Sequence, residues 1–198
     1  MVTPVALNLP LSGSDVSGLT AGDIVTLSGR LVTGRDRIHK YLAERPRKEE
    51  VPFDLSGTVL YHCGPVVEKA DGEFRAVAAG PTTSMRVEMY EAIVIREYGL
   101  RGIMGKGGMG EGTRRALKEC GCVYFHAIGG AAVYLAARIR KTVGVWKLEE
   151  FGPTEAMWLF EVEGFPAIVT MDSHGNDLHR EVEEASLKRF SELIKKSK

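Results

Sequence analysis

Hydroxyl and cationic side chains gather in two glycine-rich segments, residues 80–86 (GPTTSMR) and residues 105–112 (GKGGMGEG). Each segment has the pattern of a strand that runs into a turn and then into a helix. Such turns present backbone N–H groups and the positive end of a helix dipole, which favours anions. Arg86 and Lys106 add full positive charge close to these turns. The residues therefore predict a site for a small, multiply charged anion such as a dicarboxylate or a phosphate.

Thr82 and Thr83 lie directly before a predicted helix, and two interpretations of their hydroxyl groups stay open. The first is capping of the helix N-terminus. The second is hydrogen bonding to a bound carboxylate or a part in proton transfer. A threonine hydroxyl is a very weak base and needs a neighbouring cation to stabilise its alkoxide, for which Lys106 is the natural candidate.

Arg86 follows Thr82 by one helical turn, so both side chains can face the same side. From the residues alone, Arg86 is then either a surface arginine or part of the anion site. Arg35 and Asp36 follow another predicted strand, where a salt bridge between them is one interpretation, and His39 can line the same pocket.

Lys106 is flanked by glycines and is either a flexible loop residue or part of an anion site. The pattern GxxxxGK[ST] of phosphate-binding loops is absent, which disfavours nucleotide binding.

These motifs resemble the β subunit of class I (iron–sulfur) fumarate hydratase, which is the C-terminal domain in single-chain members. The resemblance rests on GPTTSMR, on the GKGGMG loop and on the earlier Thr33-Gly34-Arg35-Asp36, and it spans nearly the whole chain. It extends from an LxxGDxVxLSG-like start at residues 19–29 to residues 172–177 (DSHGND). The β subunit of L-tartrate dehydratase is similar as well.

The resemblance implies a heteromeric hydro-lyase that reversibly hydrates fumarate to L-malate. It assigns Thr82 as the base that removes the C3 proton and Lys106 as a substrate contact. It assigns Arg35 and Arg86 to the two substrate carboxylates. Thr83 is expected to be a further substrate-binding residue. It also implies an α subunit that carries a [4Fe–4S] cluster, an α2β2-type complex and a role in the tricarboxylic acid cycle.

Two other functions stay open: an L-tartrate dehydratase β subunit, converting tartrate to oxaloacetate, and a non-catalytic subunit for anion binding or assembly. After GPTTS the chain reads Met85-Arg86-Val87 instead of the Gly-Arg-Met of many fumarases. This difference affects the prediction of which substrate is used more than the role predicted for Arg86.

The three cysteines, Cys63, Cys120 and Cys122, predict free thiols in a reducing cytoplasm. A [4Fe–4S] cluster needs three or four converging thiolates. Cys120 and Cys122 are too close in sequence for a usual cluster pair, and Cys63 is not obviously near them. We therefore expect this chain to bind no metal and no cofactor itself.

The 198 residues carry 26 Lys plus Arg and 26 Asp plus Glu, which argues against nucleic-acid or membrane-surface binding through net charge. We find no secretory signal pattern at the start and no apolar run of about 18 residues that could span a membrane. The composition predicts an ordinary globular protein, and we treat residues 1–198 as one domain without a linker.

Strand patterns dominate both ends of the chain and β/α alternation fills its middle, which predicts an α/β fold with a mixed sheet and flanking helices. The resemblance further implies a layered, swivelling-type β/β/α domain. Residues 45–52 are expected to form a charged, solvated loop. We expect strands at 24–32, 58–62, 74–79, 102–104, 123–126, 143–147, 157–162 and 167–171, and helices after Asp36 and at 84–98, 113–119, 129–140 and 181–195. The last helix is expected to face inward with Val182, Leu187, Phe190 and Ile194.

Overall fold

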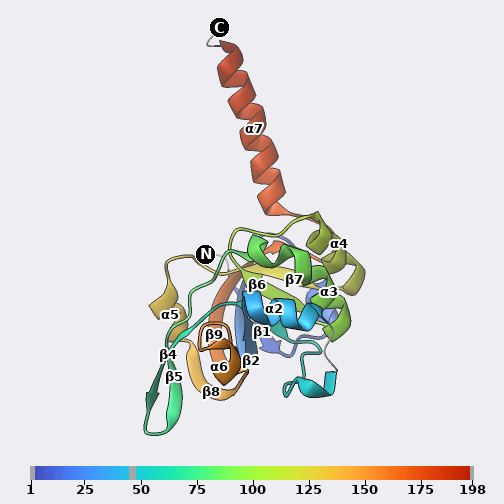
Figure 1. Cartoon of the computed structure of the whole chain (residues 1–198). Coiled ribbons are helices and arrows are strands. Elements are labelled where there is room, and N and C mark those ends of the chain that lie inside the picture. Colours follow the sequence, from blue (N-terminus) through green and yellow to red (C-terminus); the bar gives the residue numbers. More distant parts are fainter. Residues whose placement is uncertain (1–2, 45–47, 197–198) are drawn as a thin grey trace.

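One mixed sheet organises the part of the chain that the computed structural model describes, residues 3–44 and 48–196 (Figure 1). Its strand order is β1-β2-β3-β6-β7-β9-β8, and β2 also pairs with β9. The ring β2-β3-β6-β7-β9 therefore closes into a five-strand barrel. The strands are β1 (Val5–Leu9), β2 (Ile24–Gly34), β3 (Val59–His62), β6 (Gly102–Gly105), β7 (Val123–His126), β8 (Ile139–Trp146) and β9 (Met157–Met171).

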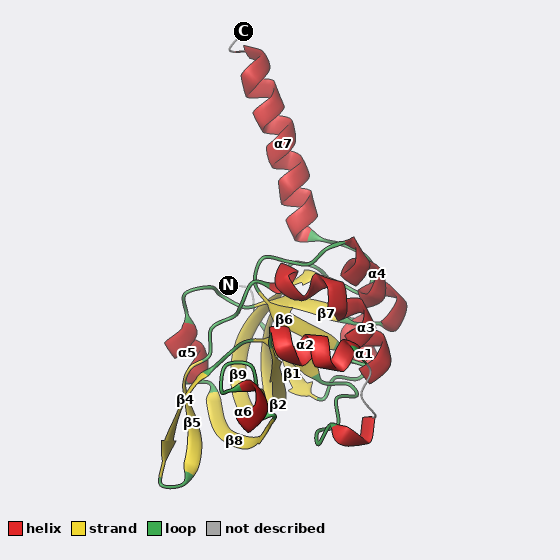
Figure 2. Cartoon of the chain, viewed as in Figure 1, coloured by secondary structure: helices red, strands yellow, loops and turns green. Residues whose placement is uncertain are grey.

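Four strands of the ring run parallel, because β2 pairs with β3, β3 with β6 and β6 with β7 in parallel register. β9 runs antiparallel to both β7 and β2 and closes the ring. β1 pairs with β2 and β8 pairs with β9 outside the ring. A separate hairpin joins β4 (Val66–Ala70) to β5 (Glu73–Ala78) and projects from one side of the body (Figure 2).

The ring strands alternate between two hydrophobic clusters, as the two-residue period of a strand requires. Tyr61 and Phe125 belong to the first cluster, whereas Leu60 and Tyr124 belong to the second. The first cluster also holds the stacked rings of Trp158 and Phe160 on β9. Burial on both faces explains why these short strands lack polar alternation in the sequence.

Helices α2 (Asp36–Ala43), α3 (Glu88–Tyr98) and α4 (Glu111–Cys120) cover the second cluster. The 3₁₀ turn Lys48–Glu50 lies between α2 and β3 in the chain. A second 3₁₀ turn, η2 (Ser84–Val87), leads directly into α3. The remaining helices are α1 (Gly13–Ser17), α5 (Ala132–Ala136), α6 (Leu148–Phe151) and α7 (Leu178–Lys196). No helix within the described ranges has the length and apolar character needed to cross a bilayer.

The structure confirms the mixed α/β fold and the flanking helices, and it differs from the expected elements at several places. Residues 157–162 and 167–171 are one strand, β9, and β4 was missed. The helix expected over 129–140 shrinks to α5, because Ile139 pairs with Val162 and starts β8. This tertiary pairing overrides the helix propensity of the alanines. The loop expected over 45–52 lies partly outside the described residues, at 45–47.

The last helix is present but does not face inward. Figure 1 shows α7 projecting from the body as a rod. Its apolar side chains lie in solvent, with Val182 64%, Leu187 57% and Phe190 60% exposed. The amphipathic pattern is real, but the described body does not cover the apolar face of this helix.

Candidate functional site

The carboxyl ends of the parallel strands bring the predicted site residues together. Arg35 follows β2, His62 ends β3 and Lys106 follows β6. Parallel neighbours end at the same edge of a sheet, and this edge is where α/β folds commonly bind ligands. The two glycine-rich segments therefore meet at one edge, which the sequence alone could not show.

Residues 82–84 run beside the end of β6 and are fixed there by backbone hydrogen bonds. The Thr82 N–H donates to the His62 carbonyl at 2.8 Å, and the Lys106 N–H donates to the Thr82 carbonyl at 3.2 Å. The Ser84 N–H returns to the Lys106 carbonyl at 3.0 Å, and Thr83 and Lys106 form a parallel bridge. Thr82 and Lys106, which we predicted to act together, are thus direct neighbours.

The Thr82 hydroxyl does not cap a helix. Its Oγ1 donates to the His62 carbonyl at 3.0 Å, and the side chain is half-buried. Thr83 is the N-cap of η2, in an extended conformation and without a side-chain cap bond, and its side chain is exposed. The helix begins only at Ser84, so the helical spacing expected between Thr82 and Arg86 does not hold. The backbone ladder holds Thr82 instead.

Asp36 lies between the two predicted arginines. Arg86 contacts it in a two-point arrangement, with Nε to Oδ1 at 3.2 Å and Nη2 to Oδ2 at 2.5 Å. Arg35 Nε lies 3.6 Å from Asp36 Oδ2 and 3.2 Å from Glu155 Oε1. The predicted Arg35–Asp36 pair is therefore present, and Asp36 also holds Arg86. Because Arg86 uses Nε and Nη2 for Asp36, its Nη1–Nη2 edge stays available for a second carboxylate.

Lys106 is half-buried in the glycine-rich loop, and its aliphatic stem reaches the chain after β7. A Cβ atom built on Gly129 would lie 3.7 Å from Lys106 Cδ. Gly107 and Gly108 adopt φ values of +84° and +73°, which side chains rarely tolerate. No carboxylate among the described residues forms an ion pair with Lys106 Nζ, so its charge is not neutralised locally.

The second predicted anion site, at the start of α4, is already filled by the protein. The Glu88 carboxylate accepts from the N–H groups of Gly110 at 2.8 Å and Thr113 at 3.1 Å, and from the Thr113 hydroxyl at 2.7 Å. This internal carboxylate satisfies the helix N-terminus. The glycine loop therefore contributes Lys106 to the edge, while the helix behind it offers little to an external anion.

Directly behind this edge lies a buried polar cluster that the sequence analysis did not identify. His39 Nε2 and His62 Nε2 lie 3.1 and 3.0 Å from Glu91 Oε2, and all three side chains are at most 1% exposed. Burial disfavours the Glu91 charge, but the two histidines outweigh it and lower the Glu91 pKa to about 2. Burial also opposes the charge of His39, but Glu91 outweighs burial there and raises the His39 pKa. At His62 burial is the stronger effect and lowers the His62 pKa.

A signal for this cluster exists in the sequence. Glu91 occupies the helical position that shares a face with Val94, Ile95 and Tyr98, where the period predicts an apolar residue. His39, expected to line the pocket with Arg35, instead points into this cluster, and its Nδ1 donates to the Arg35 carbonyl at 2.9 Å.

The cluster extends towards the glycine loop through hydroxyl groups. Ser84 Oγ lies 2.9 Å from His62 Nδ1 and 2.9 Å from the Tyr124 hydroxyl, which accepts from the Gly108 N–H at 3.3 Å. One buried network thus joins the start of α2, the end of β3, η2 and the glycine loop. These are the segments that carry Arg35, Thr82, Arg86 and Lys106.

The described thiols do not form a cluster site. Cys63 follows the carboxyl end of β3, whereas Cys122 precedes the amino end of β7, so the two lie towards opposite ends of parallel strands. Burial raises the thiol pKa of both residues, which disfavours the thiolates that iron requires.

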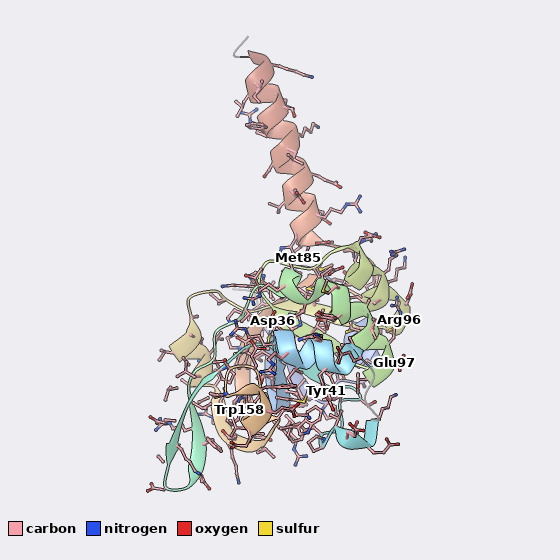
Figure 3. The ribbon with its side chains drawn as sticks, in the orientation of Figure 1. Asp36, Tyr41, Met85, Arg96, Glu97 and Trp158 are labelled. Atoms are coloured by element: carbon pink, nitrogen blue, oxygen red, sulfur yellow. The ribbon has the colours of Figure 1, made fainter. Side chains whose placement is uncertain are left out.

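A cleft of about 600 Å³ lies next to the edge, between the glycine loop and the first turns of α7. Its lining includes Met85, Gly107, Arg114, His179 and Leu187. Figure 3 labels Asp36 at the start of α2 and Met85 near the base of α7. Met85 is 51% exposed and Met89 is 72% exposed, so apolar surface adjoins the candidate site.

Comparison with known proteins defines the class of this chain. Residues 1–182 match the family described as Fumarase C-terminus. The chain is 48% identical over 190 residues to a Geobacillus stearothermophilus protein named "Putative fumarate hydratase class I", covering 96% of this chain and 36% of that protein.

Two relatives of similar length carry a different name. A Methanocaldococcus jannaschii protein named "Putative L(+)-tartrate dehydratase subunit beta" is 39% identical over 186 residues, with 93% and 95% of the two chains covered. The Escherichia coli K12 "L(+)-tartrate dehydratase subunit beta" is 36% identical over 195 residues, with 95% and 92% covered. The chain belongs to the fumarase C-terminal family, as its motifs indicated.

Proposed function

We propose that this chain is the β-type part of an iron–sulfur hydro-lyase that reversibly hydrates fumarate to L-malate. The observation that supports this proposal is that Thr82 and Lys106 are backbone neighbours at the barrel edge where Asp36 also joins Arg35 to Arg86. Three cations against Asp36 and Glu155 leave a net positive site, which suits a dianion. As part of the same proposal, we assign the chain to the layered, swivelling-type β/β/α domains that the family resemblance implies.

Arg35 and Arg86 bind the two carboxylates of a C4 dicarboxylate. Asp36 orients the Arg86 guanidinium by its Nε–Nη2 edge, so the Nη1–Nη2 edge can receive one carboxylate as a fork. Holding the guanidinium in place before the substrate arrives lowers the entropy lost on binding. Thr83, exposed beside Lys106, supplies a further hydroxyl to the same end of the substrate.

Thr82 moves the C3 proton. Before dehydration the Thr82 hydroxyl gives its own proton to water. Its Oγ1 then accepts the C3 proton, the C3–H electrons form the double bond, and the substrate hydroxyl leaves as water after protonation by an acid of the partner subunit. Lys106 stabilises the alkoxide, because it is a neighbouring cation without a local ion pair. The backbone bonds between Thr82, His62 and Lys106 hold the two chain segments that carry these groups side by side.

A partner subunit of the α type completes the enzyme and holds the [4Fe–4S] cluster, in an α2β2-type complex of the cytoplasm. When bound, such a cluster supplies Lewis-acid activation of the substrate hydroxyl. Two observations support a partner: the thiols described here do not converge, and two relatives are named as subunit beta. We place the complex in the tricarboxylic acid cycle.

The second candidate function is that of an L-tartrate dehydratase β subunit, favoured by the names of two relatives that align over nearly their whole length. Tartrate carries one more hydroxyl than malate, and dehydration gives oxaloacetate. The same arginines and threonine serve either substrate. A non-catalytic role in anion binding or assembly is the third outcome that experiment must separate.

Anaerobic co-production with an α-type partner, followed by parallel assays with L-malate and L-tartrate, tests the proposal. We expect turnover of malate by the complex and none by this chain alone. Turnover of tartrate only would select the second function. A cluster-loaded complex that converts neither substrate, or full activity of the partner-free chain, would contradict the hydro-lyase proposal.

A further inference from the structure

Three buried side chains from three different elements converge behind the barrel edge. His39 comes from α2, His62 from the end of β3 and Glu91 from α3. Each offers one donor atom, and these donor atoms all lie within 4.8 Å of one another. The two histidine Nε2 atoms lie 3.1 and 3.0 Å from Glu91 Oε2. The three side chains are at most 1% exposed, so solvent does not compete for these atoms.

Both imidazole rings are oriented by their other nitrogen. His39 Nδ1 faces the Arg35 carbonyl at 2.9 Å, and because a carbonyl only accepts, Nδ1 carries the proton. His62 Nδ1 faces Ser84 Oγ at 2.9 Å. Each ring therefore turns Nε2 towards Glu91. Histidine ligands of metal ions commonly show this arrangement, with one nitrogen held by a carbonyl or hydroxyl and the other on the ion.

The contacts at the centre of the cluster are short but do not have hydrogen-bond geometry. Although their separations are short, His39 Nε2, His62 Nε2 and both Glu91 carboxylate oxygens have no hydrogen-bond partner among the described residues. A buried carboxylate without a donor is costly. Three unpartnered donor atoms within 4.8 Å of one another are an arrangement that a shared metal ion would satisfy.

A metal ion fits between the three groups after a small adjustment. Tetrahedral zinc with bonds of about 2.1 Å spaces its donor atoms roughly 3.4 Å apart, a little more than the 3.1 and 3.0 Å between the histidine Nε2 atoms and Glu91 Oε2. Two imidazoles and one carboxylate suit Zn²⁺ and related divalent transition metals. The second oxygen of Glu91 is also unpartnered and can supply a fourth donor. We propose that His39, His62 and Glu91 form a buried structural site for one divalent transition-metal ion of the Zn²⁺ class.

The ion would tie together the segments that carry the candidate site. The His39 ring holds the carbonyl of Arg35, and the His62 carbonyl receives both the N–H and the hydroxyl of Thr82. A metal at this place thus fixes Arg35 and Thr82 without touching the substrate. This inference replaces our expectation of no metal ligand, which rested on the cysteines alone. It does not depend on which reaction the protein catalyses.

Metal analysis of the purified full-length chain tests the site. We expect about one equivalent of zinc or another divalent transition metal per chain after dialysis. After stripping with a chelator, Co²⁺ addition should give the visible absorption of a low-coordinate cobalt site, and Zn²⁺ should raise the Tm by several degrees. Glu91→Gln should lose the metal and both responses. The control His174→Gln, in an exposed turn, should keep them.

Three results would overturn the proposal. The first is a wild-type chain, produced with added metal, that binds none and shows neither the Co²⁺ spectrum nor the Tm shift. The second is metal that Glu91→Gln retains, because the ion would then sit elsewhere. The third is metal loss in His174→Gln alone. If Glu91→Gln fails to fold, the wild-type cobalt spectrum and Tm shift decide the question.

Discussion

Asp36 and Arg86 are joined by two contacts across 50 residues of sequence, from Nε to Oδ1 at 3.2 Å and from Nη2 to Oδ2 at 2.5 Å. The pair connects the first turn of α2 to η2 at the edge where the parallel strands end. The Arg86 side chain is 54% exposed and that of Asp36 is 30% exposed, so the pair is accessible to a ligand. An arginine that is oriented but not enclosed is suited to receive a carboxylate on its remaining edge.

Arg86→Ala should lower kcat/KM for the dicarboxylate on the order of 30-fold or more in the assembled complex. The lost contact is a charged hydrogen-bonded pair worth roughly 2–4 kcal/mol. Arg140→Ala is the matched control, because Arg140 is also 54% exposed and ion-paired to a carboxylate, Glu163. Equal activity of both variants would favour the non-catalytic role.

Arg86→Lys should behave much like Arg86→Ala, with kcat/KM within about threefold of it. Lysine keeps the charge but cannot contact Asp36 at two points and present a second fork. Steady-state kinetics of the three proteins measures this. If Arg86→Lys had a kcat/KM near that of wild type, a positive charge would be sufficient to bind the substrate and the two-point contact would not be needed.

Arg86→Gln should leave the free energy of unfolding within about 1 kcal/mol of wild type, because exposed ion pairs contribute little to stability. Urea unfolding of the isolated chain gives this value. A larger loss of stability would mean that Arg86 is structural, and its kinetic effects would then need another explanation.

Gly105→Ala should destabilise the chain by about 1–3 kcal/mol, because the added methyl overpacks a filled site. A Cβ atom there would lie 2.1 Å from Ser84 Oγ and 2.9 Å from His62 Nδ1. Gly13→Ala, where a Cβ meets no atom within 4 Å, is the control. Both are compared by denaturant unfolding, and similar midpoints for the two variants would contradict the close approach.

Phe190→Ser combined with Ile194→Ser should weaken assembly with the α-type partner subunit. These residues are 60% and 45% exposed on α7, and large exposed apolar surface marks interaction sites. Arg189→Ser with Lys195→Ser is the control pair on the same helix. Light scattering of the purified complex measures its mass. An unchanged mass would show that α7 is not part of the interface.

The sequence predicted the edge residues because glycine, hydroxyl and cationic residues are compressed into short segments with recognisable turn chemistry. Apart from the pair of Arg35 and Asp36, it did not predict which carboxylates contact those groups or lie behind them. Glu88 fills the start of α4 from 22 residues away, and Glu91 meets two histidines from other elements. Both carboxylates lie in α3, where the position of Glu91 on the apolar face signals a buried acid but not its partners.

Local sequence patterns could not predict the closure of the barrel either. It depends on β2 pairing with β9, in which Val32 lies opposite Leu159. Each strand is compatible with an open sheet until the other is in place. Likewise, the apolar stripe of α7 predicts a buried face, but only the fold shows that the described body leaves it uncovered.

Thr82→Val in the assembled complex tests the central claim most directly, with Thr26→Val on β2 as the matched control. Valine keeps the shape of threonine and removes the hydroxyl, so the account predicts a kcat at least about 100-fold lower, with KM little changed, for Thr82→Val alone. A Thr82→Val complex that folds, assembles and turns over at the wild-type rate would contradict the assignment of proton transfer to this edge.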